Sequence, residues 1–316
     1  MSDLNKKVQN AIKILKIAEE DAAGREDKEI SVPIYGGGGT DNQSVTIKNN
    51  IVELSYSGGK DSDVILILAK MAGIKFNAIY KNTTIDPSGT IAHAKENGAI
   101  VVKPKINFFD GIEKAGLPNR WSRWCCMFLK EYKVADVAIQ GMRRDESTKR
   151  AKNYKEPNFC RAYSKTKKVS IWLPILEWTK DDVAEFVKAE NIKCHSLYYD
   201  DDGKFHPERR LGCIGCLLAS KNNRLQQLKA HPKFVREYVK RVKIFREGAV
   251  ERRMRKKGLT LEEALDSFAG TKNEYESVFF DLFCDSRIIF EQKVNGLFGR
   301  LDCKQFLEDY FKIDLP

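Results

Sequence analysis

Short apolar runs and amphipathic stretches alternate along the chain from about residue 50 onward. Short apolar runs are typical of buried parallel strands, whereas apolar positions three or four residues apart are typical of helices. The predicted strands are 51–54, 76–80, 99–102 and 135–140, and the predicted helices are 63–71, 91–97 and 130–134. This alternation predicts an α/β fold with an open, mostly parallel sheet and helices on both faces. In such sheets, ligands bind beyond the carboxyl ends of the strands.

The flanking segments are predicted to be mainly helical. Residues 3–25 place their apolar positions, from Leu4 to Leu15, on one helical face, and the four glycines at 36–39 favour a flexible hinge. After residue 220 the strand pattern ends, and Pro232 is suited to open a helix. Further helical patterns occur at 261–265, 279–283 and 306–311. We therefore divide the chain into a helical segment with a glycine-rich loop (1–45), a sheet domain (46–220) and a helical region (221–316).

The composition is that of a globular enzyme. The 316 residues are 42% hydrophobic and 31% charged, which excludes a disordered chain, a collagen and a membrane-spanning protein. No run approaches the roughly 18 apolar residues of a membrane helix, and the first ten residues lack the apolar stretch of a signal peptide. We expect a cytoplasmic protein without membrane contact, whose eight cysteines are reduced thiols or ligands rather than disulfides.

The positive charge is concentrated in one region. Residues 221–260 carry 14 Lys and Arg against three acidic residues, a net charge of +11 that equals the net charge of the whole chain. A local basic block of this kind favours a polyanionic partner such as nucleic acid. The alternative is a solvated helix face in a lysine-rich protein.

The most specific local pattern is the Ser-Tyr-Ser-Gly-Gly-Lys-Asp-Ser sequence that follows the first predicted strand. Its glycines allow a tight turn whose N–H groups form a nest for an anion, and the following helix adds the positive end of its dipole. The spacer of a Walker loop is missing. The candidate nucleotide contacts here are Ser55, Ser57, Gly58, Gly59, Lys60, Asp61 and Ser62. This loop resembles the PP-loop of the adenine-nucleotide alpha-hydrolase superfamily, which implies ATP or an adenylated nucleotide that reacts at the α-phosphate.

Four cysteines form two pairs, Cys125–Cys126 and Cys213–Cys216. Four thiolates favour zinc or an iron–sulfur cluster, and a vicinal pair combined with a CxxC pair favours iron–sulfur, since neighbouring cysteines rarely both point toward one zinc ion. Four thiols without a metal remain the alternative.

An ordered series of motifs over residues 50–245 resembles the phosphoadenosine-phosphosulfate (PAPS) reductase-like family. The resemblance implies a [4Fe–4S] cluster on Cys125, Cys126, Cys213 and Cys216, together with ATP and Mg²⁺, so that 46–220 is a nucleotide-binding domain. The further residues that match family motifs or lie where a nucleotide would be bound are Asn82, Asp86, Arg123, Lys130, Gly141, Arg143 and Arg144. Lys60, Asp61 and Arg143 are the expected catalytic residues. Trp121, Trp124, Trp172 and Trp178 are expected in the core rather than as base-stacking platforms.

The resemblance departs from the reductases at the C-terminal end, where they carry a nucleophilic cysteine and this sequence reads Ile-Asp-Leu-Pro. We therefore expect a PP-loop ATP pyrophosphatase that adenylates a substrate for sulfur transfer. The expected substrate is nucleic acid (DNA before tRNA), as in DNA phosphorothioation, with a cysteine desulfurase or other sulfur-donor protein as partner and an oligomer possible. The alternatives are a sulfonucleotide reductase that uses Cys160, Cys284 or Cys303, and a non-enzymatic regulator that binds nucleotide and nucleic acid.

Overall fold

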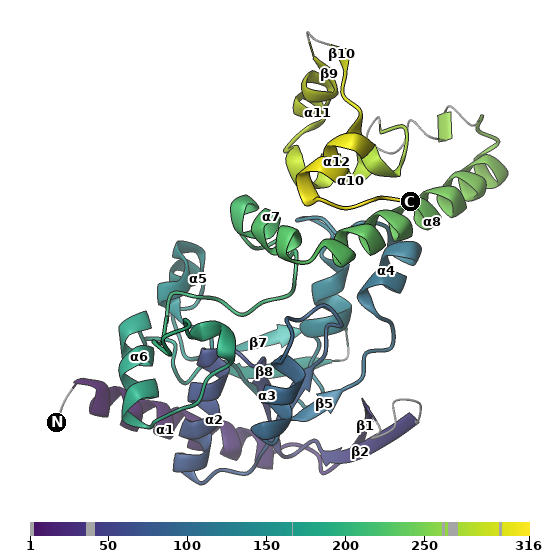
Figure 1. The fold of residues 1–316 in the computed structure, drawn as a ribbon. Helices are drawn as coiled ribbons and strands as arrows, with labels where there is room; N and C mark the ends of the chain where they lie inside the picture. Colours follow the sequence, from purple (N-terminus) through teal and green to yellow (C-terminus); the bar gives the residue numbers. More distant parts are fainter. Residues whose placement is uncertain (1–2, 36–41, 166, 261–262, 265–270, 297–298) are drawn as a thin grey trace. The chain divides into compact units, whose positions relative to one another are not determined.

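The computed structural model describes residues 3–35, 42–165, 167–260, 263–264, 271–296 and 299–316 (Figure 1). The glycines at 36–39 and most of 261–265 lie outside these residues. The described residues fall into two compact units. The first contains Met1–Asn82, Asp86–Pro104 and Leu129–Gly212, and the second contains Thr83–Ile85, Lys105–Phe128 and Cys213–Pro316. Each unit is described by itself.

The first unit is built on a sheet of eight strands in its described part. These are β1 (Glu29–Tyr35), β2 (Asn42–Lys48), β3 (Val52–Tyr56), β4 (Phe76–Lys81), β5 (Ile100–Val102), β6 (Val137–Ile139), β7 (Asn158–Ala162) and β8 (Lys168–Trp172), in the order β2-β1-β5-β4-β3-β6-β8-β7. The strands β5, β4, β3, β6 and β8 are parallel. On one side β1 and then the edge strand β2 extend the sheet antiparallel, and on the other side β7 is the antiparallel edge strand. The predicted α/β class, with a mostly parallel sheet flanked by helices, is confirmed.

Helices α1 (Asp3–Ala23), α2 (Lys60–Ala72), α3 (Thr90–Glu96) and α6 (Lys180–Ala189) share one apolar core with the sheet (Figure 1). Residues of α1 at helical spacing, including Leu4, Val8 and Leu15, are buried there, as the sequence pattern predicts. Alternate residues of β3, namely Val52 and Leu54, point into the same core. The intervening residues of β3 therefore lie on the opposite face of the sheet.

The segment after the vicinal cysteines differs from the prediction. A π-helical turn, η1, covers Cys126–Lys130, but 131–134 is not helical, so the predicted helix at 130–134 is wrong. The physical reason is the buried Glu53 carboxylate, which accepts the backbone N–H groups of Val134 (2.5 Å) and Ala135 (3.3 Å). These bonds hold the chain extended where a helix would turn it. The remaining short elements of this unit are η2 (Arg144–Glu146), α5 (Thr148–Asn153) and η3 (Ser196–Tyr198).

The second unit is mainly helical. It contains α4 (Phe108–Ala115), α7 (Lys221–Ala230), α8 (Pro232–Lys257), α10 (Glu274–Phe283), α11 (Arg287–Val294), α12 (Cys303–Phe311) and the short strands β9 (Asn295–Gly296) and β10 (Gly299–Arg300). Pro232 opens α8 as predicted, and the patterns at 279–283 and 306–311 lie in helices. Aromatic rings join the helices: Phe108 stacks on Trp124 (centroids 5.7 Å apart), and Phe283 contacts Phe306 edge to face (5.1 Å).

Two helical glycines of this unit give opposite predictions. A Cβ at Gly111 in α4 would lie 2.3 Å from the Trp124 ring, whereas one at Gly248 in α8 would meet only the flexible end of Arg252 at 3.3 Å. Alanine gains about 1 kcal/mol of helix propensity at either position. We expect Gly248→Ala to stabilise the protein by about 0.5–1 kcal/mol. Gly111→Ala is expected to destabilise it by about 1–3 kcal/mol through overpacking. Urea unfolding midpoints measure both, and an equal gain in the two variants would contradict the packing of Trp124.

Candidate nucleotide site and cysteine cluster

The glycine loop lies between β3 and α2, at the carboxyl end of a central parallel strand. Gly58 has a φ of 73°, and a Cβ at this position would lie 2.9 Å from Thr90 Cγ2. Both the backbone angle and the close approach require glycine here. Helix α2 begins at Lys60 directly after the N-cap residue Gly59. The loop therefore places a helix N-terminus, which attracts anions, at the ligand edge of the sheet.

A buried set of charges surrounds Asp61 at this loop. Asp61 accepts from Arg143 Nε at 2.7 Å and from Lys60 Nζ at 3.1 Å. The side chains of Lys60 and Arg143 are each only about 5% exposed. A Cβ at Gly141 would lie 2.8 Å from the Asp61 carbonyl oxygen, so the segment that carries Arg143 packs directly on the loop. Arg143 also pairs with Asp145 at 3.3 Å, but the Asp145 side chain is 46% exposed. Asp61 is therefore the one largely buried carboxylate in direct contact with both cations beside the helix N-terminus.

The serines of the loop have different partners. Ser62 Oγ donates to the Gly59 carbonyl oxygen at 2.6 Å, and Ser57 Oγ lies 3.3 Å away from Ser62 Oγ. These two hydroxyls stay within the loop. Ser55 precedes them on β3 and accepts a hydrogen bond from Lys133 Nζ at 2.8 Å, while its own hydroxyl donates to Glu53. The structure thus places Ser55 with a buried charge cluster on the other face of the strand.

The remaining predicted nucleotide contacts are spread over several places. Asn82 is buried where β4 ends, and Asp86 accepts a hydrogen bond from Tyr80 at 2.6 Å. Arg144 donates to the Tyr154 carbonyl oxygen at 2.6 Å and pairs with Glu177, so its partners are not those of Arg143. Lys130 is exposed at the end of η1 in the first unit, and Arg123 is half-buried in the second unit.

A buried polar network beside the loop was not singled out from the sequence. Asp63 accepts from the Tyr56 hydroxyl at 2.5 Å and lies 3.1 Å from His93 Nε2, and the His93 ring meets His195 edge to face. Burial, followed by the Asp63 charge, raises the pKa of Tyr56. His195 Nε2 in turn lies 3.5 Å from Thr90 Oγ1. Because Thr90 also abuts Gly58, this network braces the loop from the side of α3.

Glu53, Lys81 and Lys133 form a fully buried charge cluster under Ser55. Lys81 Nζ donates to Glu53 at 2.6 Å, and Lys133 Nζ lies 3.7 Å from the same carboxylate. Burial alone would raise the pKa of Glu53, but the two lysines outweigh it and lower the pKa to about 2. Burial and the neighbouring Lys81 lower the pKa of Lys133 to about 7, against the opposing pull of Glu53, and Arg161 adds to the lowering.

The cysteine pairs all lie in the second unit, and all four side chains are half-buried. The CxxC pair forms a turn at Gly215 (φ 68°), and the backbone N–H of Ile214 donates to the Ile85 carbonyl oxygen at 2.8 Å. The Cys213 thiol donates to Thr83 Oγ1 at 3.5 Å. A hydrogen bond with Cys126, then burial, then the nearby Cys213 raise the pKa of Cys125. The fold therefore brings members of both pairs close enough to interact.

Four cysteine thiols are suitable ligands for an iron–sulfur cluster or zinc, but the positions of these four thiols are only partly suited to binding a metal. Among the described residues, no group of three or more His, Cys, Asp or Glu side chains is positioned to hold a metal ion. The thiols instead make hydrogen bonds to each other and to Thr83. The other cysteines differ: Cys160 is exposed, whereas Cys194, Cys284 and Cys303 are buried.

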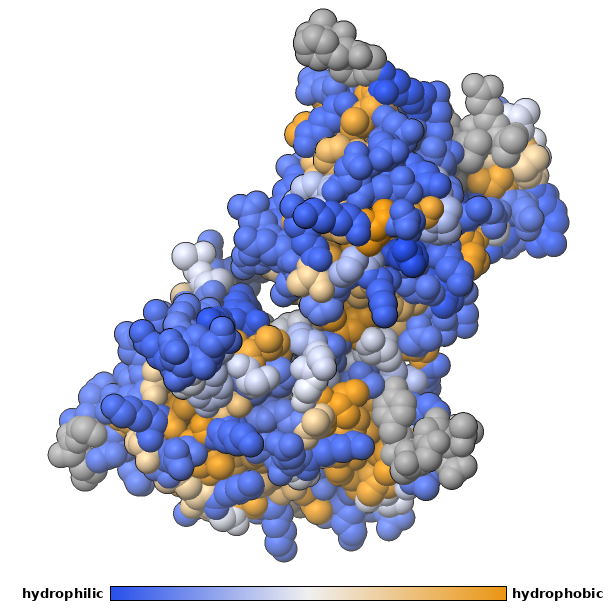
Figure 2. Space-filling view, in the orientation of Figure 1, coloured by the Kyte–Doolittle hydropathy of each residue, from blue (hydrophilic) through white to orange (hydrophobic). Residues whose placement is uncertain are grey.

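The basic region divides into internal and exposed cations. Arg224 pairs with Asp281 at 2.6 Å, Arg241 with Asp110 at 3.1 Å, and Arg246 donates to Thr271 Oγ1 at 2.8 Å. These arginines hold the second unit together. The exposed cations of α8 are Lys233, Arg236, Lys240, Lys243, Arg252, Arg255, Lys256 and Lys257. The face of α8 and α10–α12 in view is mainly hydrophilic (Figure 2).

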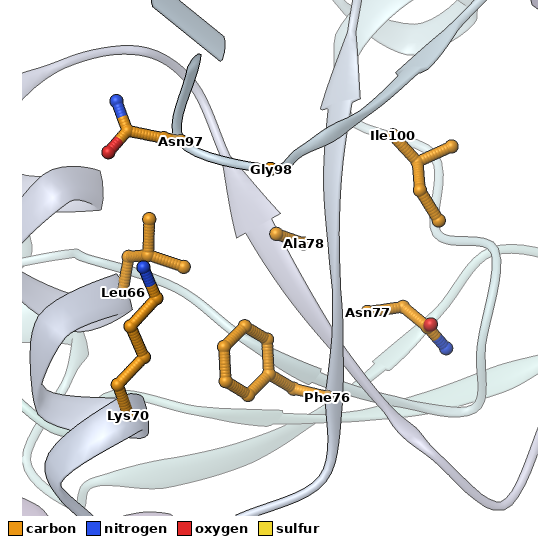
Figure 3. Close-up of a pocket in the computed structure, with 8 residues that line it drawn as sticks. All are labelled: Leu66, Lys70, Phe76, Asn77, Ala78, Asn97, Gly98 and Ile100. Atoms are coloured by element: carbon orange, nitrogen blue, oxygen red, sulfur yellow. The ribbon is translucent and has the colours of Figure 1, made fainter. Parts of the chain in front are cut away.

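A shallow cavity of about 310 Å³ in the first unit lies at the other end of the sheet. Its lining includes Phe76 at the amino end of β4 and Gly98 before β5 (Figure 3). Ligands of parallel sheets bind at the carboxyl ends, so this cavity is separate from the glycine loop.

A glycine loop between a central parallel strand and a helix N-terminus, with buried cations beside it, defines an α/β protein with a PP-loop nucleotide site. The sequence pattern of the phosphoadenosine phosphosulfate reductase domain matches residues 51–219. This is more than half of the chain, and the chain belongs to that family.

The individual relatives have low sequence identity to this chain. An uncharacterised protein of Methanocaldococcus jannaschii is 30% identical over 63% of this chain, which spans 49% of that protein's length. An adenosine 5'-phosphosulfate reductase of Staphylococcus saprophyticus is 23% identical over 68% of this chain and 85% of its own. A solved structure, FMN adenylyltransferase of Candida glabrata with FMN and an ATP analogue, has a TM-score of 0.39 at 14% identity over 68% of this chain and 66% of its own. In the described part of the chain, every helix is too short or too polar to span a lipid bilayer.

The Glu53 cluster gives a stability prediction. Above pH 7 and up to the ordinary lysine pKa of 10.5, the unfolded chain binds a proton at Lys133 that the native protein lacks, so stability should rise with pH across this window. Lys133→Met removes the surplus cation, and the rise should become shallower. Glu53→Gln leaves two buried ammonium groups without their carboxylate and should cost about 3–5 kcal/mol near pH 7.

Urea unfolding from pH 6 to 10 measures both effects. Lys70→Met, at an exposed position of α2, is the control for loss of a lysine. The cluster assignment fails if Lys133→Met and Lys70→Met have the same pH profile.

Proposed function

We propose that this protein is an ATP pyrophosphatase that adenylates its substrate as the first step of sulfur transfer to nucleic acid. The observation that carries the proposal is the buried Lys60–Asp61–Arg143 set beside the loop. Asp145 also pairs with Arg143 but is partly exposed, so Asp61 is the one largely buried carboxylate shared by two buried cations. Burying cations in this way is costly, and a bound anion would offset that cost. A triphosphate supplies that charge at the N-terminus of α2.

In the proposed reaction, ATP places its β- and γ-phosphates on Gly58, Gly59 and the first turn of α2. A substrate oxygen attacks the α-phosphorus in line, the bond to the β-phosphate oxygen breaks, and pyrophosphate leaves with the bonding electrons. Lys60 and Arg143 stabilise the charge that develops on the phosphates, and Asp61 keeps both cations in position. Mg²⁺, which such phosphate chemistry requires, supplies further charge neutralisation. The terminal sulfur of a donor persulfide would later displace AMP from the adenylated product, and a second thiol would then reduce the S–S bond to the donor protein.

In this proposal Cys125, Cys126, Cys213 and Cys216 hold a [4Fe–4S] cluster. Their common unit and the half-buried positions of all four side chains support this assignment. Iron–sulfur clusters are held by four cysteine thiolates, the number that these two pairs supply. No step of the adenylation depends on it.

Sulfonucleotide reduction is the second candidate, because two relatives are named adenosine 5'-phosphosulfate reductase. Reduction needs a reactive thiolate. Burial raises the pKa of Cys284, and burial together with the Glu276 charge raises the pKa of Cys303 to about 12, so neither thiol is a ready nucleophile. Cys160 is exposed on β7 and remains the candidate for this role.

The partners follow from the same proposal. The exposed cations of α8 support a nucleic-acid substrate, with DNA placed before tRNA. A cysteine desulfurase or another donor protein would deliver sulfur as a persulfide, and self-association is compatible with this scheme. We expect these reactions in the cytoplasm, where ATP and reduced thiols are available.

Lys60→Ala should reduce the release of pyrophosphate from labelled ATP by about 10²–10³-fold, because it removes one of the two cations at the phosphates. Lys70→Ala, on the exposed end of the same helix, is the matched control and should retain full activity. The assay needs Mg²⁺ and both DNA and tRNA as acceptors. Wild-type protein that forms sulfite from adenylylsulfate and a thiol, but never pyrophosphate from ATP, would replace this proposal with the reductase.

Cys213→Ser should lower the iron content and remove the visible absorption of anaerobically purified protein, since a hydroxyl is a poor ligand for iron–sulfur clusters. Cys160→Ser, which changes an exposed cysteine of the first unit, should leave both unchanged. Unchanged iron content in Cys213→Ser would remove this residue from the ligand set.

A further inference from the structure

Two tryptophans three residues apart in the second unit have opposite surroundings. Trp124 is 7% exposed, donates from Nε1 to the Gly116 carbonyl oxygen at 3.1 Å and stacks on Phe108. Trp121 is 97% exposed. The expectation that both belong to the core is therefore right for Trp124 and wrong for Trp121. At 97% exposure, the two faces of the Trp121 indole ring are open to solvent.

The turn that carries Trp121 is held by its own hydrogen bonds. Asn119 Oδ1 accepts the backbone N–H groups of Trp121 at 2.9 Å and of Ser122 at 2.7 Å, and the Asn119 N–H donates to the Ser122 carbonyl oxygen at 3.2 Å. Trp124 anchors the next part of the chain in the core. The indole of Trp121 is thus presented on a fixed backbone, which lowers the entropy lost when a ligand orders it.

The exposed indole contributes nothing to the folding of this unit. Burying an aromatic side chain removes a large apolar area from water, and this side chain forgoes that gain. The Trp121 ring therefore has no packing role in this unit, and both of its faces are available to a ligand.

The surroundings of Trp121 point to a nucleobase. Its chain neighbours are polar or cationic: Arg120 is exposed on one side, and Ser122 and Arg123 follow on the other. An energetic centre of a protein–protein interface is instead ringed by other contacts that exclude water. Aromatic rings with nearby cations are the recognition elements of single-stranded nucleic acid, where each base offers a π-face and each phosphate a charge.

We propose that Trp121 is a stacking platform for an unpaired base of a single-stranded nucleic acid, with Arg120 contacting the neighbouring phosphate. This inference rests on the nucleic-acid substrate of the proposed function and makes it more specific. A base inside a duplex is already stacked on both sides, so the platform selects single strands, loops or flipped bases. Exposed cations on α8 of the same unit supply the non-specific attraction.

The test is the binding of the full-length protein to fluorescein-labelled oligo(dT) and oligo(U), measured by anisotropy without ATP. Trp121→Ala should weaken binding by about 5- to 150-fold, the effect of one lost stacking contact, and Trp121→Phe should restore most of the affinity. Ile288→Ala, which truncates an exposed apolar side chain on α11, is the matched control and should bind like wild type. Arg120→Ala should reduce the salt dependence of binding, whereas Trp121→Ala should leave the salt slope unchanged.

Four results would overturn the platform. These are wild-type protein that binds neither oligonucleotide, duplex bound as tightly as single strand, Trp121→Ala within twofold of wild type, and Trp121→Phe as weak as Trp121→Ala. Loss of self-association in Trp121→Ala without any effect on oligonucleotide binding would assign the residue to a protein contact instead. Pyrophosphate release from ATP is measured separately, so failure of the proposed function is distinguished from failure of the platform.

Discussion

The charge balance around Asp61 is the constraint on which the nucleotide site depends. Lys60 and Arg143 come from segments far apart in the sequence, and both are removed from water beside Asp61, while Arg143 also reaches the partly exposed Asp145. Gly58 and Gly141 make this approach possible, because a Cβ at either position would meet Thr90 or the Asp61 backbone at less than 3 Å. The close packing thus holds two buried cations beside the N-terminus of α2, an arrangement that complements an anion.

Strand β3 supports this frame differently on its two faces. On one face Val52 and Leu54 join the apolar core under α1 and α2. On the other face Glu53 and Ser55 join two buried lysines in a polar cluster. A buried ionic cluster stabilises a fold only when its groups satisfy one another, and here the carboxylate does so by also taking two backbone N–H groups of 134 and 135. The same bonds determine how the chain leaves the vicinal cysteines.

The second unit gathers the features that sulfur transfer to a polymer would use. It holds all four paired cysteines, the exposed cations of α8 and the Trp121 turn. Its arginines show how one residue type serves two purposes: Arg224, Arg241 and Arg246 are committed to internal partners, while other basic residues of the same window face solvent. The total charge of this window therefore overstates the number of cations that a polyanion could contact.

Much of the architecture could be predicted from the sequence because its signals are local. The apolar period of 3–25, the alternation from residue 50 and the Gly-Gly-Lys-Asp-Ser loop after a strand are each patterns of neighbouring residues. The structure has a helix at 3–23, a mostly parallel sheet and a loop at these places. The antiparallel strands β1, β2 and β7 were not predicted, because partly exposed strands lack continuous apolar runs. The parallel strand β8 was also missed, since its buried residues alternate with less buried ones.

Only the tertiary structure decided how the side chains are used. The pairing of Arg143 with Asp61, the burial of Glu53, the internal role of Arg246 and the exposure of Trp121 all depend on segments that are distant in the chain. Trp121 and Trp124 show the reason most directly. Residue type sets what a side chain can do, but its burial is determined by neighbours that three-dimensional packing brings together.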